Sequence, residues 1–194
     1  MMEKGYKKVF WGFLITIFDI NIGSINILPD FIGYFIMSSG IYILYSEFQN
    51  DNFKMANTLA NFLMGYSLIM GIVDYAILTN NIGSGLYEHP VYIIIGFILS
   101  IVISSVILIM AFKIISGFVD LYLHREMEDE VNILINKQKN YTVLTITGLL
   151  LISVSLNISN EYFITASTFF LIAVNLYFAV ILRGILRDSE GMAL

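Results

Sequence analysis

The run from Val91 to Ile103 constrains the fold most, because it is apolar on every face and continues in the same character to Phe112. A hydrocarbon core takes about 20 residues of helix to cross, and only helices and closed barrels satisfy their own backbone hydrogen bonds in lipid. Barrel strands alternate between lipid-facing and lumen-facing residues, and this run does not alternate. The run therefore predicts a transmembrane helix.

Composition extends this prediction to the rest of the chain. Only 13% of the 194 residues are charged, whereas soluble domains carry about 25%. The chain has no cysteine, which excludes disulfides, thiolate metal ligands and cysteine-linked lipid anchors. Its basic N-terminus and first apolar run resemble a signal peptide, but no small-residue cleavage motif follows. We therefore expect an uncleaved first helix.

Six apolar segments are separated by polar or breaker-rich links. The clearest link, Asn21–Tyr34, contains Gly23 and Asn26 for a tight turn and Pro29 at the start of the next segment. We predict a single all-α domain over residues 1–194, an integral membrane bundle of six transmembrane helices in three hairpins. The expected segments are residues 9–26, 30–45, 55–78, 90–112, 141–156 and 162–182, with a cytoplasmic helical extension over 113–138.

The positive charges predict the orientation of this bundle. If all six segments cross the membrane, the ten Lys and Arg residues fall on one side, and the three opposite turns contain none. Cytoplasmic loops are the ones enriched in Lys and Arg. We therefore expect both termini in the cytoplasm and three short outer turns.

The first turn and its flanks also carry a resemblance. The stretch Ile25-Asn-Ile-Leu-Pro-Asp-Phe-Ile-Gly-Tyr34 and the later Asn52-Phe-Lys-Met-Ala56 resemble an uncharacterised group of small multi-pass membrane proteins of Gram-positive bacteria. In that group the turn commonly reads Ile-Asp-Ile-Leu-Pro-Asp-Phe-Ile-Gly-Tyr, so Asn26 replaces an Asp here. The resemblance implies a protein of the bacterial cell membrane and brings no catalytic residue with it.

Carboxylates and amides inside the segments are the candidates for an ion or polar-solute site. Asp19 and Asp74 each lie toward the outer end of a segment. An intramembrane carboxylate usually marks a pathway or a paired site, but near a segment end it can also reach the interface or cap a turn. Facing each other, the two could hold a proton or a cation. Asn57 and Asn61 share a helix face, and we expect them to bond a neighbouring helix, a polar-solute path being the alternative.

Two patterns of spacing predict contacts between helices. Small residues recur every four positions at Gly96, Ser100 and Ser104, where another helix, internal or from a second copy, can approach closely. The predicted extension carries an apolar stripe opposite an acidic face. It either packs on the inner ends of the bundle or docks a partner, and its residues are Leu123, Met127, Val131 and Leu134.

Motifs of other chemistries are missing from the sequence. His124 and Glu128 do not form the Glu-x-x-His pattern of di-iron bundles, since position 121 is Leu. There is no zinc-protease motif, no phosphate-binding loop, no nucleophile elbow and no basic patch for nucleic acid. We therefore expect neither an enzyme nor a metal or other cofactor, and no nucleic-acid partner.

Two functional classes stay open. The first is a non-enzymatic accessory or interaction subunit, whose partners are the lipid bilayer and a membrane or cytoplasmic protein or a second copy. The second is a small transporter or channel for an ion or small solute that uses Asp19, Asp74, Asn57 and Asn61.

Overall fold

The computed structural model describes residues 2–17, 21–22, 25–26, 30–80, 90–158 and 161–191. In this part of the chain the fold is all-α, as predicted, apart from one two-residue strand pair. The strands β1 (Asn21–Ile22) and β2 (Ile25–Asn26) pair antiparallel. The helices are α1 (Met2–Ile17), α2 (Asp30–Phe48), α3 (Asp51–Asn80), α5 (Pro90–Leu123), α6 (Glu128–Ile158) and α7 (Glu161–Gly191).

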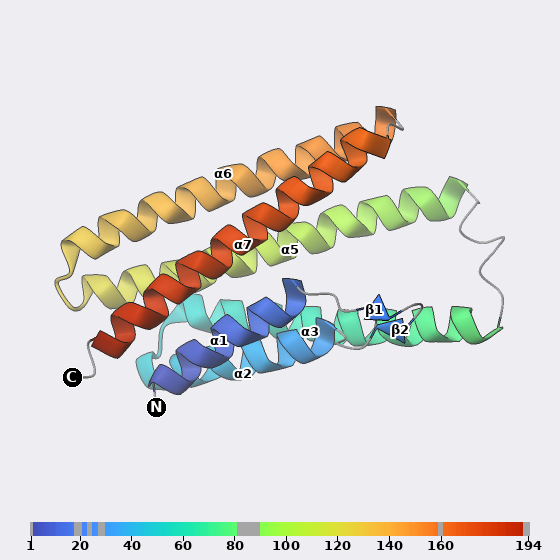
Figure 1. The fold of residues 1–194 in the computed structure, drawn as a ribbon. Helices are drawn as coiled ribbons and strands as arrows, with labels where there is room; N and C mark the ends of the chain where they lie inside the picture. The colour runs from blue at the N-terminus through green and yellow to red at the C-terminus, as the bar shows by residue number, and fades with distance from the viewer. Residues whose placement is uncertain are drawn as a thin grey trace.

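Consecutive helices run antiparallel, so that the chain forms three hairpins (Figure 1). One end of the molecule holds both termini, the link between α2 and α3, and the turn between α5 and α6 (Figure 1). We call this end the basic end. Each helix packs on the next one in sequence, and α1 also contacts α7. The contacts therefore close a ring of six helices.

Three of the described helices are long and apolar enough to cross a membrane. These stretches are residues 51–73 of α3, 94–123 of α5 and 161–188 of α7. The sequence predicted six spans, and those in α1, α2 and α6 do not meet this criterion within the described residues. For α1 the reason is length, because its 16 residues extend about 24 Å and a hydrocarbon core is about 30 Å thick.

Two expected helix boundaries are wrong. The first segment was expected to be helical to residue 26, but α1 ends at Ile17 and residues 21–26 include the strand pair. The helical extension over 113–138 is also wrong, because α5 ends at Leu123. Glu126 has a left-handed φ of 58°, and the chain reverses there. The acidic residues 128–130 form the first turn of α6, where negative charge complements the helix dipole.

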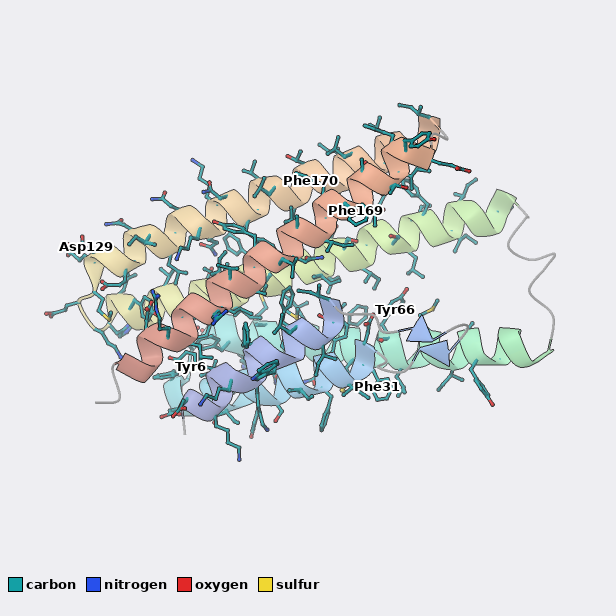
Figure 2. The ribbon with its side chains drawn as sticks, viewed as in Figure 1. Tyr6, Phe31, Tyr66, Asp129, Phe169 and Phe170 are labelled. Atoms are coloured by element: carbon teal, nitrogen blue, oxygen red, sulfur yellow. The ribbon has the colours of Figure 1, made fainter. Side chains whose placement is uncertain are left out.

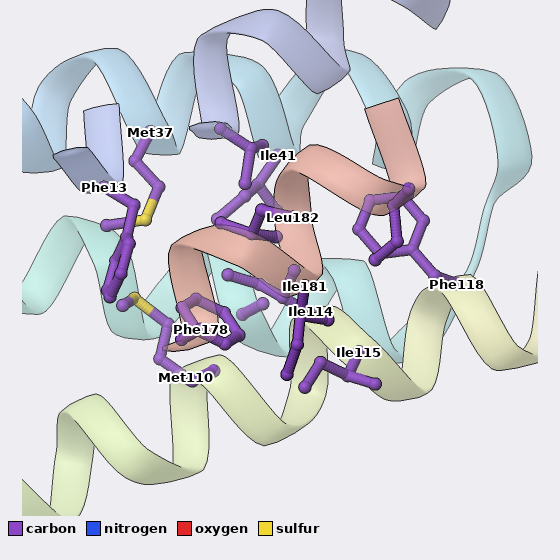
Figure 3. Close-up of a cluster of buried hydrophobic side chains, with 14 of the residues drawn as sticks. Phe13, Met37, Ile41, Met110, Ile114, Ile115, Phe118, Phe178, Ile181 and Leu182 are labelled. Atoms are coloured by element: carbon purple, nitrogen blue, oxygen red, sulfur yellow. The ribbon is translucent and has the colours of Figure 1, made fainter. Parts of the chain in front are cut away.

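The buried core lies in the half of the bundle nearest the basic end. Phe13 and Met37 face Met110 and Phe178 across the bundle (Figure 3), and the rings of Phe13 and Phe178 meet edge to face at 4.6 Å. All six helices contribute to this core. Its largest fully buried side chains are Tyr141, Phe53, Phe118, Phe178, Met37, Ile41, Leu44, Leu63, Met110, Ile114, Ile115 and Ile181.

The other half of the bundle exposes apolar side chains. With 16 and 19 residues, α1 and α2 are much shorter than the other four helices, which have 30 to 34 residues and extend beyond them. Large exposed side chains in this outer half include Ile72, Ile98, Leu150 and Phe169, the last seen on α7 in Figure 2. Surface of this kind suits contact with lipid or with another membrane helix.

Glycines bring α1 and α2 into close contact. A Cβ atom added to Gly12 would lie 2.5 Å from the backbone nitrogen of Met37 and 2.7 Å from the carbonyl oxygen of Gly33. One added to Gly40 would lie 2.8 Å from the carbonyl oxygen of Gly5. Because the obstructing atoms belong to the backbone, the two helices can lie this close only where a side chain is absent.

Candidate functional site

The two carboxylates proposed for an ion site are not described as a pair. Asp19 lies outside the described residues. Asp74 belongs to α3, but its side chain lies outside the described part of the chain. Whether the two carboxylates meet therefore stays a prediction.

Asn57 and Asn61 meet a hydroxyl group of the neighbouring helix. The Oγ atom of Ser38, on α2, lies 2.8 Å from Oδ1 of Asn57 and 2.7 Å from Oδ1 of Asn61. A hydroxyl has one proton, so Ser38 donates to one of these oxygens at a time. The contact joins α2 to α3, as expected for amides that hold membrane helices together. Ser38 is buried, whereas the Asn61 side chain is exposed near the middle of the α3 span.

The small-residue face of α5 has open space beside Gly96 within the part of the chain that the structure describes. A Cβ atom added to Gly96 would meet nothing within 4 Å, and Ser100 is exposed, while Ser104 is half-buried. The close helix contact that the spacing of Gly96, Ser100 and Ser104 predicts is therefore not made by the described chain at Gly96. Sequence reasoning missed the glycines that do make such a contact, although Gly5 and Gly12, like Gly33 and Gly40, are seven residues apart and so share helix faces.

The predicted apolar stripe does not lie on one continuous helix, and its second half packs on the bundle, which was one of the two alternatives. Leu123 ends α5 and is 53% exposed, and Met127 follows the turn. Val131 and Leu134 belong to α6 and are only 5% and 4% exposed, because they pack into the core of this chain. Apolar spacing alone could not reveal the turn, since the residues that form it are polar.

A polar network that sequence reasoning did not single out joins three elements at the basic end. The side-chain amides of Asn50 and Asn52 donate to Oδ2 of Asp120 at 2.9 and 2.8 Å. Lys113 donates to Oδ1 of Asn52 at 3.0 Å. Asn50 also caps α3, because its Oδ1 accepts from the backbone nitrogens of Asn52 and Phe53. The network fixes the α2–α3 link to α5, and the density of Asn and Asp in that link was its only sequence signal.

A cavity also lies at the basic end, between α5, α6 and α7. Its volume is about 400 Å³, within the range of about 300–1,000 Å³ typical of small-molecule sites. Four charged side chains line it together with a tyrosine and apolar residues. The lining residues are Tyr122, Met127, Glu130, Ile133, Leu134, Lys137, Ile181, Gly184, Ile185, Arg187 and Asp188.

A second, smaller cavity lies at the outer edge of the core. Its volume is about 60 Å³, enough for a few water molecules. Thr16, Tyr34 and Asn175 supply its polar groups, and apolar side chains of α1 and α5 supply the rest. The structure therefore places Asn175 at the wall of a cavity, which its position in an apolar segment did not predict.

Metal-binding clusters are missing from the described residues. Within them, no group of three or more His, Asp or Glu side chains could hold a metal ion. The Nδ1 atom of His124 lies 2.7 Å from the carbonyl oxygen of Asp120, so the imidazole ring hydrogen-bonds the backbone at the end of α5.

At the N-terminus, the hydrogen bond from Lys7 lowers the pKa of Glu3, and both side chains are exposed.

The fold and these sites define a class: an all-α protein with three helices able to cross a membrane. No family model, curated protein or solved structure matches the chain. The resemblance carried by the first turn therefore stays a prediction.

Proposed function

We propose that all six helices cross the membrane, with both termini in the cytoplasm. The arrangement of α5, α6 and α7 supports this topology, because α5 and α7 run in the same direction and each is long enough to cross. The chain must then return between them, and α6 is the helix that does so. The short α1–α2 hairpin fits if the bilayer thins beside it or its flanking residues reach the interface.

Within that topology, the proposed function is that of a non-enzymatic interaction subunit of a bacterial cell membrane. The observation that carries it is the exposed amide of Asn61 near the middle of the α3 span. Polar groups inside a membrane rarely face lipid, because hydrocarbon offers them no hydrogen bond. Ser38 can satisfy only the oxygen of this amide, so an exposed Asn61 at this depth favours a neighbouring helix that accepts a hydrogen bond from its amino group.

The residues around Asn61 suit such a neighbour. Thr58, Asn61, Gly65, Leu68 and Ile72 recur every three or four positions, so they share one side of the helix, the α3 face. A Cβ atom added to Gly65 would meet nothing within 4 Å, so another backbone can approach there. Small residues and amides together are typical of contacts between membrane helices. The partner expected on this face is a membrane helix of another chain.

The absence of cysteine makes a direct test possible. A single cysteine introduced as Leu68→Cys is the only attachment point for a photo-crosslinker, and crosslinking in native membranes should give one defined adduct. Gly65→Leu should reduce the yield of that adduct by roughly tenfold, equivalent to about 1.4 kcal/mol of binding free energy.

Gly71→Leu is the matched control, because Gly71 also has nothing within 4 Å but lies on a different side of α3. It should leave the adduct unchanged. Equal yields from the two leucine variants, or no defined adduct at all, would contradict an interaction through the α3 face.

Transport of an ion or small solute is the second candidate, favoured by the small cavity beside Asn175. Thr16, Tyr34 and Asn175 place polar groups where the bundle changes from packed to open. In liposomes loaded with a pH-sensitive or cation-sensitive dye, a transporter should show flux that Asp19→Asn or Asp74→Asn abolishes. A broad panel of solutes without flux would sink this candidate.

A further inference from the structure

The 400 Å³ cavity at the basic end combines both signs of charge on an apolar floor. Lys137 and Arg187 supply the cations, and Glu130 and Asp188 supply the carboxylates. Gly184 lies beside Lys137, because a Cβ atom added there would be in ordinary contact, 3.9 Å from Nζ of Lys137. The ammonium group of Lys137, on α6, therefore lies beside the backbone of α7.

A buried hydroxyl group lies next to the same cavity. Tyr122, one of the lining residues, is only 4% exposed, and its hydroxyl has no hydrogen-bond partner among the described residues. Leaving such a group unpaired costs about 1–3 kcal/mol. The oxygen exposes less than 1 Å² of surface, so a ligand in the cavity would meet the ring of Tyr122 and not its hydroxyl.

The position of the cavity relative to the candidate membrane spans indicates that its ligand comes from the lipid bilayer. The candidate spans of α5 and α7 end at Leu123 and Asp188, and Tyr122 and Asp188 both line the cavity. The charged side chains therefore lie at the level where lipid headgroups meet water. Ile133, which is 53% exposed, adds apolar surface to the lining, which suits the first part of an acyl chain.

We propose that this cavity binds the headgroup of a phospholipid that carries a primary ammonium, as in phosphatidylethanolamine. Lys137 and Arg187 bind the phosphate, and Glu130 and Asp188 accept hydrogen bonds from the ammonium. Basic pockets between membrane helices are known to bind lipid phosphates. The carboxylates make the cavity selective for an ammonium headgroup, because charge-assisted hydrogen bonds are stronger than hydrogen bonds between neutral groups.

This arrangement discriminates between headgroups. Choline has no N–H group to donate, so phosphatidylcholine cannot hydrogen-bond the two carboxylates. Phosphatidylglycerol has no positive charge and would leave Glu130 and Asp188 near its phosphate without compensation. We therefore expect phosphatidylethanolamine to bind about tenfold more tightly than either lipid, the equivalent of one charge-assisted hydrogen bond.

The test uses the full chain purified in detergent and native mass spectrometry with the three lipids carrying identical acyl chains. The double variant Glu130→Gln/Asp188→Asn should lose the preference for phosphatidylethanolamine. Its matched control is Glu128→Gln/Asp129→Asn, which removes the same two kinds of charge from exposed neighbours outside the cavity and should keep the preference. Asp129 stands at the exposed start of α6 (Figure 2).

A second variant guards against loss of folding in the first. Gly184→Leu fills the cavity without changing any charge, and it should reduce retention of phosphatidylethanolamine to that of phosphatidylcholine, with gel filtration reporting the folded state. Equal retention of the three lipids by the unaltered protein would overturn the proposal. So would tight binding of soluble glycerophosphoethanolamine with no lipid retained, because the ligand would then come from solution.

The inference rests on the membrane placement proposed above but not on the α3 face. Gly65→Leu should therefore bind the three lipids as the unaltered protein does. Loss of the crosslinked adduct and loss of lipid selectivity are thus separate results, and either proposal can fail alone.

Discussion

Single glycines decide how closely the first hairpin packs. The atoms that a side chain on Gly12 would meet are the backbone nitrogen of Met37 and the carbonyl oxygen of Gly33. A flexible side chain could rotate away from a new methyl group, but the backbone of a helix cannot move without shifting its neighbours. Strain at this position therefore spreads to the whole α1–α2 pair.

Gly12→Ala should destabilise the protein by about 1–3 kcal/mol, the usual cost of overpacking. The measurement is the melting temperature in detergent, which should fall. Gly96→Ala provides the comparison, because Gly96 has open space beside it and alanine is up to about 1 kcal/mol better than glycine in a helix. Equal melting temperatures for the two variants would show that α1 and α2 do not lie this close.

Asp120 is the residue that ties the α2–α3 link to α5, since it accepts from both Asn50 and Asn52. Asp120→Ala leaves two amide groups without their acceptor, and each such group costs about 1–3 kcal/mol when shielded from water. Denaturation in increasing SDS should therefore begin at a lower concentration. Asp129→Ala removes an exposed carboxylate and should change little; a similar loss in both variants would mean that the network does not stabilise the fold.

At the scale of elements, the turn between α5 and α6 determines where two helices end. It reverses the chain through Glu126, whose φ of 58° is one that side chains disfavour by about 1–2 kcal/mol. The backbone nitrogens of Arg125 and Met127 both donate to the carbonyl oxygen of Tyr122. The turn is therefore well bonded although it contains neither glycine nor proline.

Glu126→Gly should stabilise the protein by up to about 1 kcal/mol, because glycine adopts a positive φ without steric cost. The same change inside a helix has the opposite sign: Lys139→Gly, in the exposed part of α6, should cost about 1 kcal/mol. Melting temperatures of the two variants should move in opposite directions. A lower value for Glu126→Gly would contradict the left-handed turn.

The elements also show which features could be predicted from the sequence. The all-α class and the hairpin order follow from the apolar runs and the breakers between them. The turn after Leu123 could not be predicted from periodicity, because Leu123, Met127, Val131 and Leu134 keep a helical spacing across it. The charged stretch before Val131 was interpreted as the polar face of a continuing helix, whereas three of its acidic residues begin α6.

The candidate site was predicted less well than the fold. Asn57 and Asn61 could be predicted as amides that bond a neighbouring helix, although their partner Ser38 could not be named. The basic-end cavity depends on side chains of three helices, and Lys137 and Asp188 are distant in sequence. Only their packing in space brings them together, so no local motif could reveal them.

At the scale of the whole molecule, the orientation can be checked directly. A reporter enzyme that works only outside the cytoplasm should be active when fused at Gly85 and inactive when fused at Asn132, because the positive-inside rule predicts that the basic end faces the cytoplasm. Both fusions should be present at similar levels on a blot. The reverse pattern would place the basic end, and with it the cavity proposed to bind a lipid headgroup, on the other side of the membrane.

The contact between α1 and α7 has a consequence for biosynthesis. The ribosome delivers α1 first and α7 last, yet Phe13 completes its packing only against Phe178. At typical rates of synthesis roughly ten to thirty seconds separate the two. During that interval the nascent chain holds an unfinished core, and in the proposed topology α1 would be sheltered by lipid, by α2 or by the insertion machinery until the final helix arrives.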